Sequence, residues 1–398
     1  MTAPKPGAGL LPIALESAAR GILIPILSLI LLNKGLTLST LPAGLAACSI
    51  AILIFELPGG ILSDWIGRKR IFLIAQVFYL AGLGLLLISQ TPAAAMIAMA
   101  LYGIARAASS GSLDALTMDA VLAVYGKDHL AWITARIGTV RAAGLALGSL
   151  AGGLLYQIGL QTGFQNSSLF LTILTALFLT IAAFFTAVIF TKEISAKSEV
   201  KASRHCSIPN LTSAKALLPF FAAVSLMGIF ISMIETYWQP RLSELLGQDS
   251  LLWLLGLLGF CYFGVSILGA AAAEPLLKRN TPEHIFPAAY LLTGLCLIVL
   301  SLTEHPALFF ILYLLLYFFV GIGDIALTVS INQEAPSALY ATILSLQSFM
   351  FQLGGLWGSF LSGLAVKHLG IPGLWFIGAI LFLASSGWLR ACILKQKH

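Results

Sequence analysis

Long apolar stretches separated by short polar segments constrain the fold of this chain more than any other feature of its sequence. A helix of about 20 apolar residues spans the core of a bilayer, and twelve apolar stretches therefore predict twelve transmembrane helices. Only 10% of the residues are charged, against roughly 25% in soluble domains, which excludes a water-soluble fold. The predicted helices cover Leu10–Leu32, Leu41–Leu62, Ile71–Ile88, Ala93–Tyr125, Leu130–Ile158, Ser168–Phe190, Ala216–Gln239, Leu251–Ala273, Ile285–Leu302, Ala307–Ile331, Leu339–Val366 and Leu374–Ile393.

The distribution of positive charge predicts how these helices are oriented. With the N-terminus inside the cell, fifteen of the 22 Lys and Arg residues fall in cytoplasmic segments, and only Lys34, Arg241 and Lys367 fall outside. This excess follows the positive-inside rule. We therefore expect both termini in the cytoplasm, and we attribute the net charge of +6 to membrane topology and not to nucleic acid binding.

One polar segment divides the predicted helices six and six. We expect an N-terminal six-helix bundle over residues 1–191, a cytoplasmic linker over 192–214 and a C-terminal six-helix bundle over 215–398. The predicted fold is thus an all-α membrane protein made of two pseudo-symmetric bundles. Parallel repeats of this kind are typical of secondary transporters, whose substrate path runs between the halves.

A single offset of 210 residues relates the two predicted bundles without a gap. It places Gly111 and Asp114 on Gly321 and Asp324. Matches in several separate regions argue for a duplication, so corresponding residues are expected to do related work in each half. The same offset places Asp64, Arg68, Gly144, Gly148 and Ser149 on Glu274, Lys278, Gly354, Gly358 and Ser359.

The turn between the second and third predicted helices carries a signature. The segment reads Gly59-Gly60-Ile-Leu-Ser-Asp64-Trp-Ile-Gly67-Arg68-Lys69-Arg70. It resembles the G-x-L-x-D-x-x-G-R-[KR] motif of the major facilitator superfamily. That resemblance implies a twelve-helix transporter, working as a monomer without a cofactor, in which this loop pairs with an acidic residue low on the fourth helix. Asp119 is the candidate partner of Arg68, and the implied role is a cytoplasmic gate that Glu274 and Lys278 repeat in the second half.

Two further segments resemble the exporters of that superfamily. The segment Gly144-Leu-Ala-Leu-Gly148-Ser149-Leu-Ala-Gly152-Gly153 resembles the G-x(3)-G-P-x-x-G-G motif, with Ser149 in place of the proline. The fourth helix, from Arg106 to Asp119, resembles the arginine segment of the drug/proton antiporters. Simple helix packing is the alternative interpretation of the glycines, because small residues four apart let helices approach closely.

Ionisable residues inside the predicted helices are the best candidates for binding substrate or protons, since each costs about 2.5–3.5 kcal/mol to insert. Glu16 and Arg20 lie one turn apart on the first helix, so they can pair. Arg106 lies near mid-membrane and needs a counter-charge, for which Asp114, Glu16 or a substrate anion is available. Arg141 is a further partner. Each of these pairs has a structural alternative, a salt bridge that only joins helices.

Asp324 differs from its repeat mate Asp114 in its expected surroundings. Every arginine predicted to lie inside the membrane belongs to the N-terminal half, so Asp324 is expected to lack a cation and to carry a proton. Both aspartates have a structural alternative in helix packing. Glu235 is a further candidate for substrate or proton binding, and Tyr237 and Trp238 beside it are expected to form part of an aromatic belt.

The leading functional hypothesis is proton-coupled efflux of amphiphilic organic compounds by alternating access, in the inner or plasma membrane of a bacterium. The alternative is a narrower exporter or importer of an anionic metabolite, such as a siderophore or organic acid, because arginines bind carboxylates in a bidentate manner. The expected partners are a small-molecule substrate, protons and lipid. An enzyme is not expected, because no loop is large enough for a catalytic domain and no His or Cys cluster suggests a metal.

Overall fold

The computed structural model describes residues 7, 9–162, 167–191, 211–247, 251–334 and 340–396, and every regular element in this part of the chain is helical. Residues 192–210 of the predicted linker lie outside the described residues. The helices are α1 (Leu10–Leu23), α2 (Leu27–Asn33), α3 (Leu41–Ile66), α4 (Arg68–Ile88), α5 (Pro92–Ser109), α6 (Ser112–Tyr125), α7 (Leu130–Gln161), α8 (Ser167–Phe190), α9 (Leu211–Leu246), α10 (Trp253–Leu277), α11 (Pro282–Leu302), α12 (Pro306–Glu334) and α13 (Tyr340–Gln396), with a 3-10 turn at Lys127–His129.

The prediction of twelve helices is confirmed once the broken and merged elements are matched to it. Gly370, with φ 65° and ψ 177°, divides α13 into the two predicted C-terminal helices. Nine helices of the described part are long and apolar enough to cross a membrane, or ten if the bent pair α1 and α2 is one span. Two more spans complete the twelve. Helix α13 is counted among the ten as one span although it contains two helices, and α3 is not counted because its apolar described part, Leu41–Glu56, is too short.

Two of the predicted helices each consist of two shorter helices, which was not expected, although Pro92–Tyr125 still counts as one membrane span. The axes of α1 and α2 differ by 53° across Ile24–Ile26. Pro25 lies in that break, where it lacks an N–H group and clashes with the preceding turn. The fourth predicted helix breaks between α5 and α6, where Gly111 has φ 74°. This break places Asp114 in the first turn of α6.

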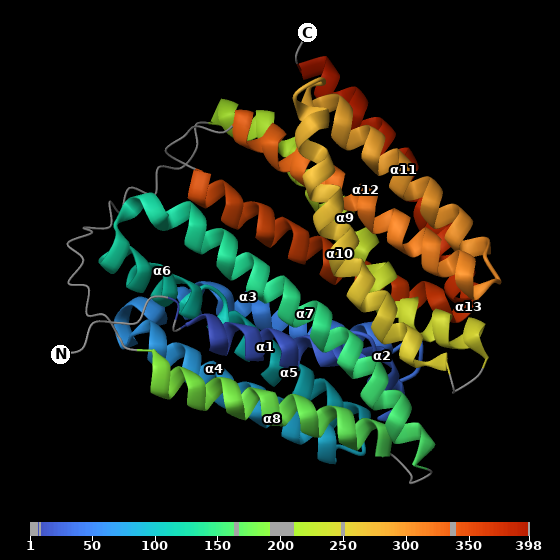
Figure 1. The fold of residues 1–398 in the computed structure, drawn as a ribbon. Coiled ribbons are helices and arrows are strands. Elements are labelled where there is room, and N and C mark those ends of the chain that lie inside the picture. Colours follow the sequence, from blue (N-terminus) through green and yellow to red (C-terminus); the bar gives the residue numbers. More distant parts are fainter. Residues whose placement is uncertain are drawn as a thin grey trace. The chain divides into compact units, whose positions relative to one another are not determined.

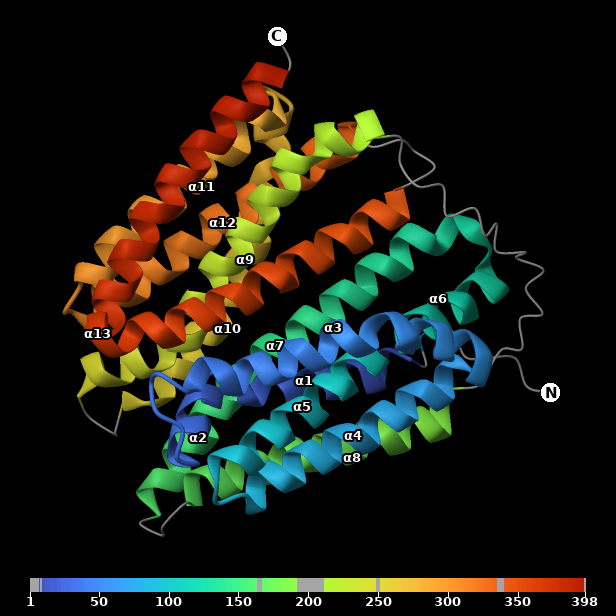
Figure 2. The same cartoon turned by 180° about the vertical axis from the view of Figure 1, so that it is seen from behind.

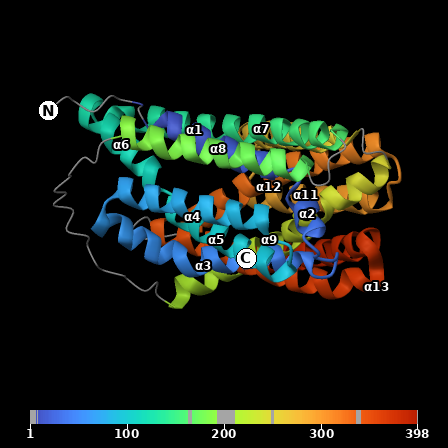
Figure 3. The same cartoon turned by 90° about the horizontal axis from the view of Figure 1, so that it is seen from below.

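The first compact unit contains Met1–Lys197 together with Leu246–Phe260. Within it, α1 packs against α7 and α8, and α5 packs against α3 and α4. Figure 1 shows α1 beside α7, and Figure 3 shows α1, α7 and α8 running side by side. Figure 2 shows α4 along α8 on the same unit.

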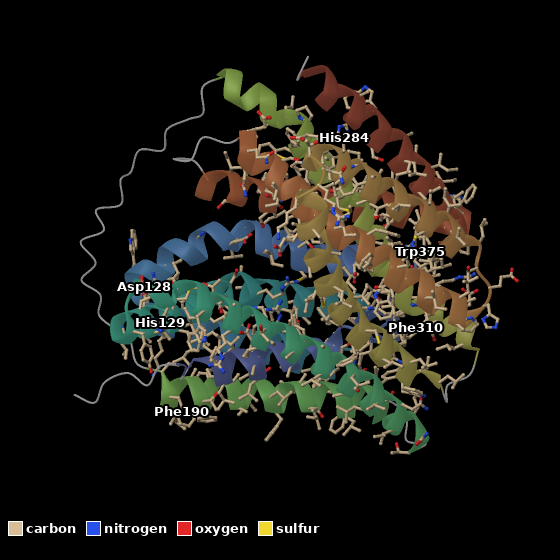
Figure 4. The ribbon with its side chains drawn as sticks, turned by 45° about the horizontal axis from the view of Figure 1, so that its top comes forward. Asp128, His129, Phe190, His284, Phe310 and Trp375 are labelled. Atoms are coloured by element: carbon tan, nitrogen blue, oxygen red, sulfur yellow. The ribbon has the colours of Figure 1, made fainter. Side chains whose placement is uncertain are left out.

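The second compact unit contains Ser198–Leu245 together with Cys261–His398. In it, α11 packs against both α12 and α13. Trp375 of α13, labelled in Figure 4, is fully buried and donates its indole N–H to the carbonyl oxygen of Met233 in α9, at 3.2 Å. The ring of Phe309 in α12 lies 6.1 Å from Trp375, so one buried aromatic residue joins three helices of this unit.

Glycines allow the closest helix contacts in the first unit. A Cβ atom added at Gly144 of α7 would lie 2.8 Å from the carbonyl oxygen of Ala14 in α1. Gly148 and Gly152 meet the backbone of α1 in the same way, one and two turns further along. The segment that resembles the exporter motif therefore packs α7 directly onto α1 through a row of small residues.

The second unit repeats this packing at the positions that the 210-residue offset predicts. Gly354 and Gly358 of α13 meet the backbone of α9 at Ser225 and Ile229. Ser359, the counterpart of Ser149, shares a hydrogen bond of 2.8 Å with Ser232 of α9. The duplicated glycines thus make corresponding helix contacts in each unit.

Replacing Gly148 with Ala is expected to destabilise the protein by about 1–3 kcal/mol, because the new methyl group would overlap the carbonyl group of Ala18. Gly138, on the same helix, has no atom within 4 Å of an added Cβ. G138A is therefore a matched control, expected to be neutral or to stabilise by about 0.4–1 kcal/mol. Thermal unfolding of both purified variants in detergent measures the difference. Equal midpoints would contradict the packing role of Gly148.

Candidate functional site

Asp114 and Arg141 form an ion pair inside the first unit. The Nη2 atom of Arg141 donates to both carboxylate oxygens of Asp114, at 2.6 and 2.5 Å. Asp114 lies in the first turn of α6, where the helix dipole also favours a negative charge. Both side chains are less than one-third exposed. The two charges cancel each other, and the pair ties α6 to α7.

Glu16 and Arg20 lie on one face of α1, with their nearest charged atoms 3.9 Å apart. The hydroxyls of Tyr102 in α5 and Tyr79 in α4 lie within electrostatic range of the Arg20 guanidinium. Glu16 is only 5% exposed, and within the described part of the chain its Oε1 atom and the Tyr79 hydroxyl have no hydrogen-bond partner. Helices α1, α4 and α5 thus build a buried polar cluster around Arg20.

Arg106 belongs to the same neighbourhood. It lies in the last turn of α5 beside the thiol of Cys48 in α3, and Tyr102 lies within range of both Arg20 and Arg106. Among the residues that the structure describes, no carboxylate comes within 4.0 Å of the Arg106 guanidinium. Asp114, one of its expected counter-charges, is bound to Arg141 instead. Two arginines and one carboxylate, that of Glu16, therefore lie within electrostatic range of the Tyr102 hydroxyl.

The pairing that the family motif implies for Arg68 is present. Its Nη1 atom donates to Oδ2 of Asp119, which joins the start of α4 to α6. Gly67, with φ 107°, makes the turn that separates α3 from α4. Gly60 and Asp64 belong to α3, but their surroundings lie outside the described residues.

The corresponding turn of the second unit lacks this connection between helices. Lys278 pairs with Glu274 of its own helix, with Nζ and Oε1 2.7 Å apart, and both side chains are more than 70% exposed. Val329 occupies the position that corresponds to Asp119. The two halves therefore resemble each other in the turn and differ in the acid that the turn binds.

Asp324 of α12 faces two cavities inside the second unit. The larger, of about 450 Å³, is lined by residues of α9, α11, α12 and α13. The smaller, of about 300 Å³, is lined by residues of α9, α10, α12 and α13. No Lys, Arg or His lines either cavity, and within the described ranges Asp324 makes no ion pair. It is a carboxyl group without a cation.

The duplication explains why Asp324 has no cation. Asp114 corresponds to Asp324, and its partner Arg141 corresponds to Phe351. Phe351 lines both of the cavities that Asp324 faces. One half thus places a guanidinium beside the duplicated aspartate, and the other half places an aromatic ring at the corresponding position.

Glu235 of α9 lies close to the smaller cavity. Its Oε1 atom accepts a hydrogen bond from the hydroxyl of Tyr317 in α12. The Tyr317 ring packs against Tyr262 and Tyr313, with centroids 4.4 and 4.9 Å apart. Because Tyr262 and Tyr317 both line the cavity with Asp324, tyrosines connect the two acids of this unit.

Tyr237 and Trp238 do not form an aromatic belt, so that expectation was wrong. They are 0% and 1% exposed, whereas belt residues face the membrane surface. Trp238 packs against Tyr313, with ring centroids 5.3 Å apart. Helix α9 continues past Pro240 to Leu246. Tyr237 and Trp238 therefore lie inside the helix sequence and not at its end, and both rings pack in the core of the unit.

Arg241 corrects a second expectation, since it was predicted to lie outside the helices. It lies within α9, and its side chain is 10% exposed. It donates to Oε2 of Glu244 at 2.9 Å and to the carbonyl oxygen of Thr303 at 3.1 Å. The second half therefore also holds a buried arginine, but this one is engaged and lines neither cavity beside Asp324.

Four neutral polar residues of the larger cavity were not predicted: Tyr290, Thr328, Gln347 and Ser348. Charges inside apolar stretches, on which the sequence prediction relied, do not reveal neutral side chains. Comparison of the two halves would have revealed them, because the first half has no polar side chain at any of the four corresponding positions.

Comparison with known proteins places this arrangement in a family. The model of the Major Facilitator Superfamily matches residues 11–359. The uncharacterized MFS-type transporter YxaM of Bacillus subtilis (strain 168) is 23% identical over 393 residues, which cover 93% of this chain and 91% of YxaM.

Solved structures share the fold at low sequence identity. A mutant of the nucleoside transporter NupG has a TM-score of 0.82 at 14% identity, with 98% of each chain covered. The POT family transporter PepTSo has a TM-score of 0.76 at 12% identity, with 100% of this chain and 99% of that chain covered. These likenesses concern the fold and not the substrate.

Replacing Asp114 with Asn, or Arg141 with Gln, is expected to lower thermal stability, because each change leaves one partly buried charge without its partner. The double variant D114N/R141Q is expected to lose less than the sum of the two, with a coupling energy of about 1 kcal/mol. Thermal unfolding of the four proteins in detergent measures this coupling. Strictly additive losses would contradict the ion pair.

Proposed function

This chain belongs to the major facilitator superfamily, and we propose that, as a secondary transporter of that family, it couples transport to protons through Asp324. The observation that carries the proposal is the contrast between Asp324, which faces two cavities without a cation, and Asp114, which Arg141 neutralises. A lone carboxylate inside a membrane is costly while ionised. Taking up and releasing a proton changes that cost, and this links the protein's states to the proton gradient.

The substrates we propose are amphiphilic organic compounds. The walls around Asp324 are mostly apolar and include Val224, Met227, Ile325 and Phe351. Pockets with apolar walls and few polar groups bind organic molecules and use the polar groups to orient them. A compound with an apolar body and one polar or cationic group suits this lining.

The direction we propose is efflux by alternating access, in the inner or plasma membrane of a bacterium and with both termini in the cytoplasm. The support for efflux is the exporter-like segment of α7, and the support for orientation is the positive-charge excess. The Arg68–Asp119 pair then belongs to a cytoplasmic gate, with Glu274 and Lys278 as its counterpart. The bundles in this proposal are residues 1–191 and 215–398, joined by the linker 192–214, and the protein acts as a monomer.

A second candidate function is transport of an anionic metabolite, such as a siderophore or organic acid. The observation that favours it is the excess of cations around Tyr102, where Arg20 and Arg106 and only one carboxylate, that of Glu16, lie within electrostatic range. Guanidinium groups bind carboxylates with two parallel hydrogen bonds. In this alternative the substrate supplies the missing negative charge.

Replacing Asp324 with Asn is expected to abolish proton-driven accumulation in proteoliposomes, because Asn cannot exchange a proton. Uptake of a panel of radiolabelled amphiphilic amines, with and without an imposed pH gradient, measures the effect. Glu304, an exposed acid between α11 and α12, gives the matched control E304Q, which should transport like the wild type. Gradient-driven accumulation by D324N, or gradient-independent transport by the wild type, would refute proton coupling through Asp324.

The substrate class is expected to separate the two candidates. Amphiphilic amines should be accumulated by the wild type and should compete with one another, and R20Q and R106Q should keep that activity. If instead carboxylate compounds are transported and amines are not, and if R20Q or R106Q abolishes that transport, the anionic alternative replaces the first proposal.

A further inference from the structure

The larger cavity beside Asp324 has several polar residues in a mostly apolar lining, of which Ser348 is exposed. Tyr290 of α11, Thr328 of α12 and Gln347 of α13 all line it together with Asp324. Three different helices therefore bring neutral hydrogen-bonding groups to one acid. Proton coupling through Asp324 requires the acid alone, so these three neutral groups have no role in it.

Two polar atoms at this cavity are buried without a partner among the described residues. They are the hydroxyl oxygen of Tyr290 and the Oε1 atom of Gln347. Tyr290 as a whole residue is 0% exposed. Buried polar atoms in folded proteins are nearly always hydrogen-bonded, so each of these two atoms needs a partner that the described residues do not supply.

Packing holds the Tyr290 hydroxyl in place. Its ring lies between Phe286 and Phe382, with centroids 5.9 and 5.5 Å away. On the α12 side it lies against Gly323, where an added Cβ would come within 2.8 Å of the ring. Gly323 directly precedes Asp324, so the absence of a side chain there lets Tyr290 approach the helix that carries the acid.

The amide of Gln347 is held at one end and free at the other. Its Nε2 atom donates to the Thr328 hydroxyl at 3.0 Å, whereas Oε1 has no partner in the described part of the chain. Thr328 lies one helical turn after Asp324 on α12, so both face the same cavity. Thr328 therefore orients Gln347 and leaves one polar atom of its amide available.

The fold does not require polar groups at these positions. The 210-residue offset places Tyr290, Thr328 and Gln347 on Leu80, Met118 and Ile137 of the first half. Ile137 belongs to an apolar core there, and Met118 packs against that core. The first half forms the same architecture with apolar residues at these positions. The three polar residues of the second half therefore serve something other than the stability of the fold.

We propose that Tyr290 and Gln347, with Thr328 as the positioning residue, form a hydrogen-bonding subsite for a carboxamide group of the transported compound. The tyrosine hydroxyl donates to the amide carbonyl, and the glutamine oxygen accepts from the amide N–H. This subsite refines the substrate class and thus rests on the proposed function. A quaternary ammonium compound without such a group satisfies neither atom, and an ester satisfies only one.

The test measures equilibrium binding to the purified full-length protein in detergent at one pH, without a gradient. Two matched pairs of probes differ only in an amide or an ester: procainamide with procaine, and N-methylbenzamide with methyl benzoate. The wild type should bind each amide about tenfold more tightly than its ester, because a site built to bond an N–H rejects an analogue that lacks it.

The variants separate recognition from structure. Q347L should raise the Kd of the amides to that of the esters and leave the esters unchanged. Y290F should weaken amides and esters alike, because both keep the carbonyl acceptor. T328V should weaken the amide preference through the loss of Gln347 orientation. Q76L, a change of a fully buried glutamine in the first unit, is the control and should keep the preference.

Equal Kd values for amides and esters in the wild type would overturn the subsite, as would a preference that survives in Q347L, or no binding of either amide. Because the assay has no proton gradient, failure of proton coupling leaves this result unaffected. An intact amide preference with uncoupled transport would refute only the role of Asp324. Normal coupling without an amide preference would refute only the subsite.

Discussion

An ionised side chain inside a bilayer must find a counter-charge or lose its charge, since the insertion of one costs about 2.5–3.5 kcal/mol. The described residues resolve this constraint in different ways. Asp114 is neutralised by Arg141, and Arg241 is held by Glu244 and a backbone carbonyl. Asp324 has neither kind of partner. In each unit, the packing of the helices determines whether a buried charged group has a partner of opposite charge.

Close helix packing makes such pairing possible. The glycine rows on α7 and α13 bring those helices against α1 and α9, so the angular position of every side chain on them is fixed. Arg141 lies one turn before this row, and Phe351 occupies the same position in the other half. A single change of residue type between the copies therefore decided whether an aspartate was neutralised, while the backbone packing stayed alike.

Much of the fold could be predicted from the sequence, because a membrane requires apolar stretches of fixed length. The Arg68–Asp119 pair could also be expected, because the resemblance of the turn to the major facilitator motif implies it. The bend at Pro25 was missed because hydropathy measures the length of a stretch and not the direction of its axis. The choice of Arg141 as the partner of Asp114 depends on the rotation of packed helices, which no spacing along the chain reveals.

Helix α6 is held by ion pairs as well as by apolar packing, since Leu113, Leu116 and Val121 belong to a buried core. It is a 14-residue segment that begins after Gly111 in the left-handed conformation. Its acids bind two different neighbours, Arg141 on α7 and Arg68 on α4. The two ion pairs tie α6 to α4 and to α7, in addition to its apolar contacts. The second part of the fourth membrane span is thus fastened to its own bundle by charge on two sides.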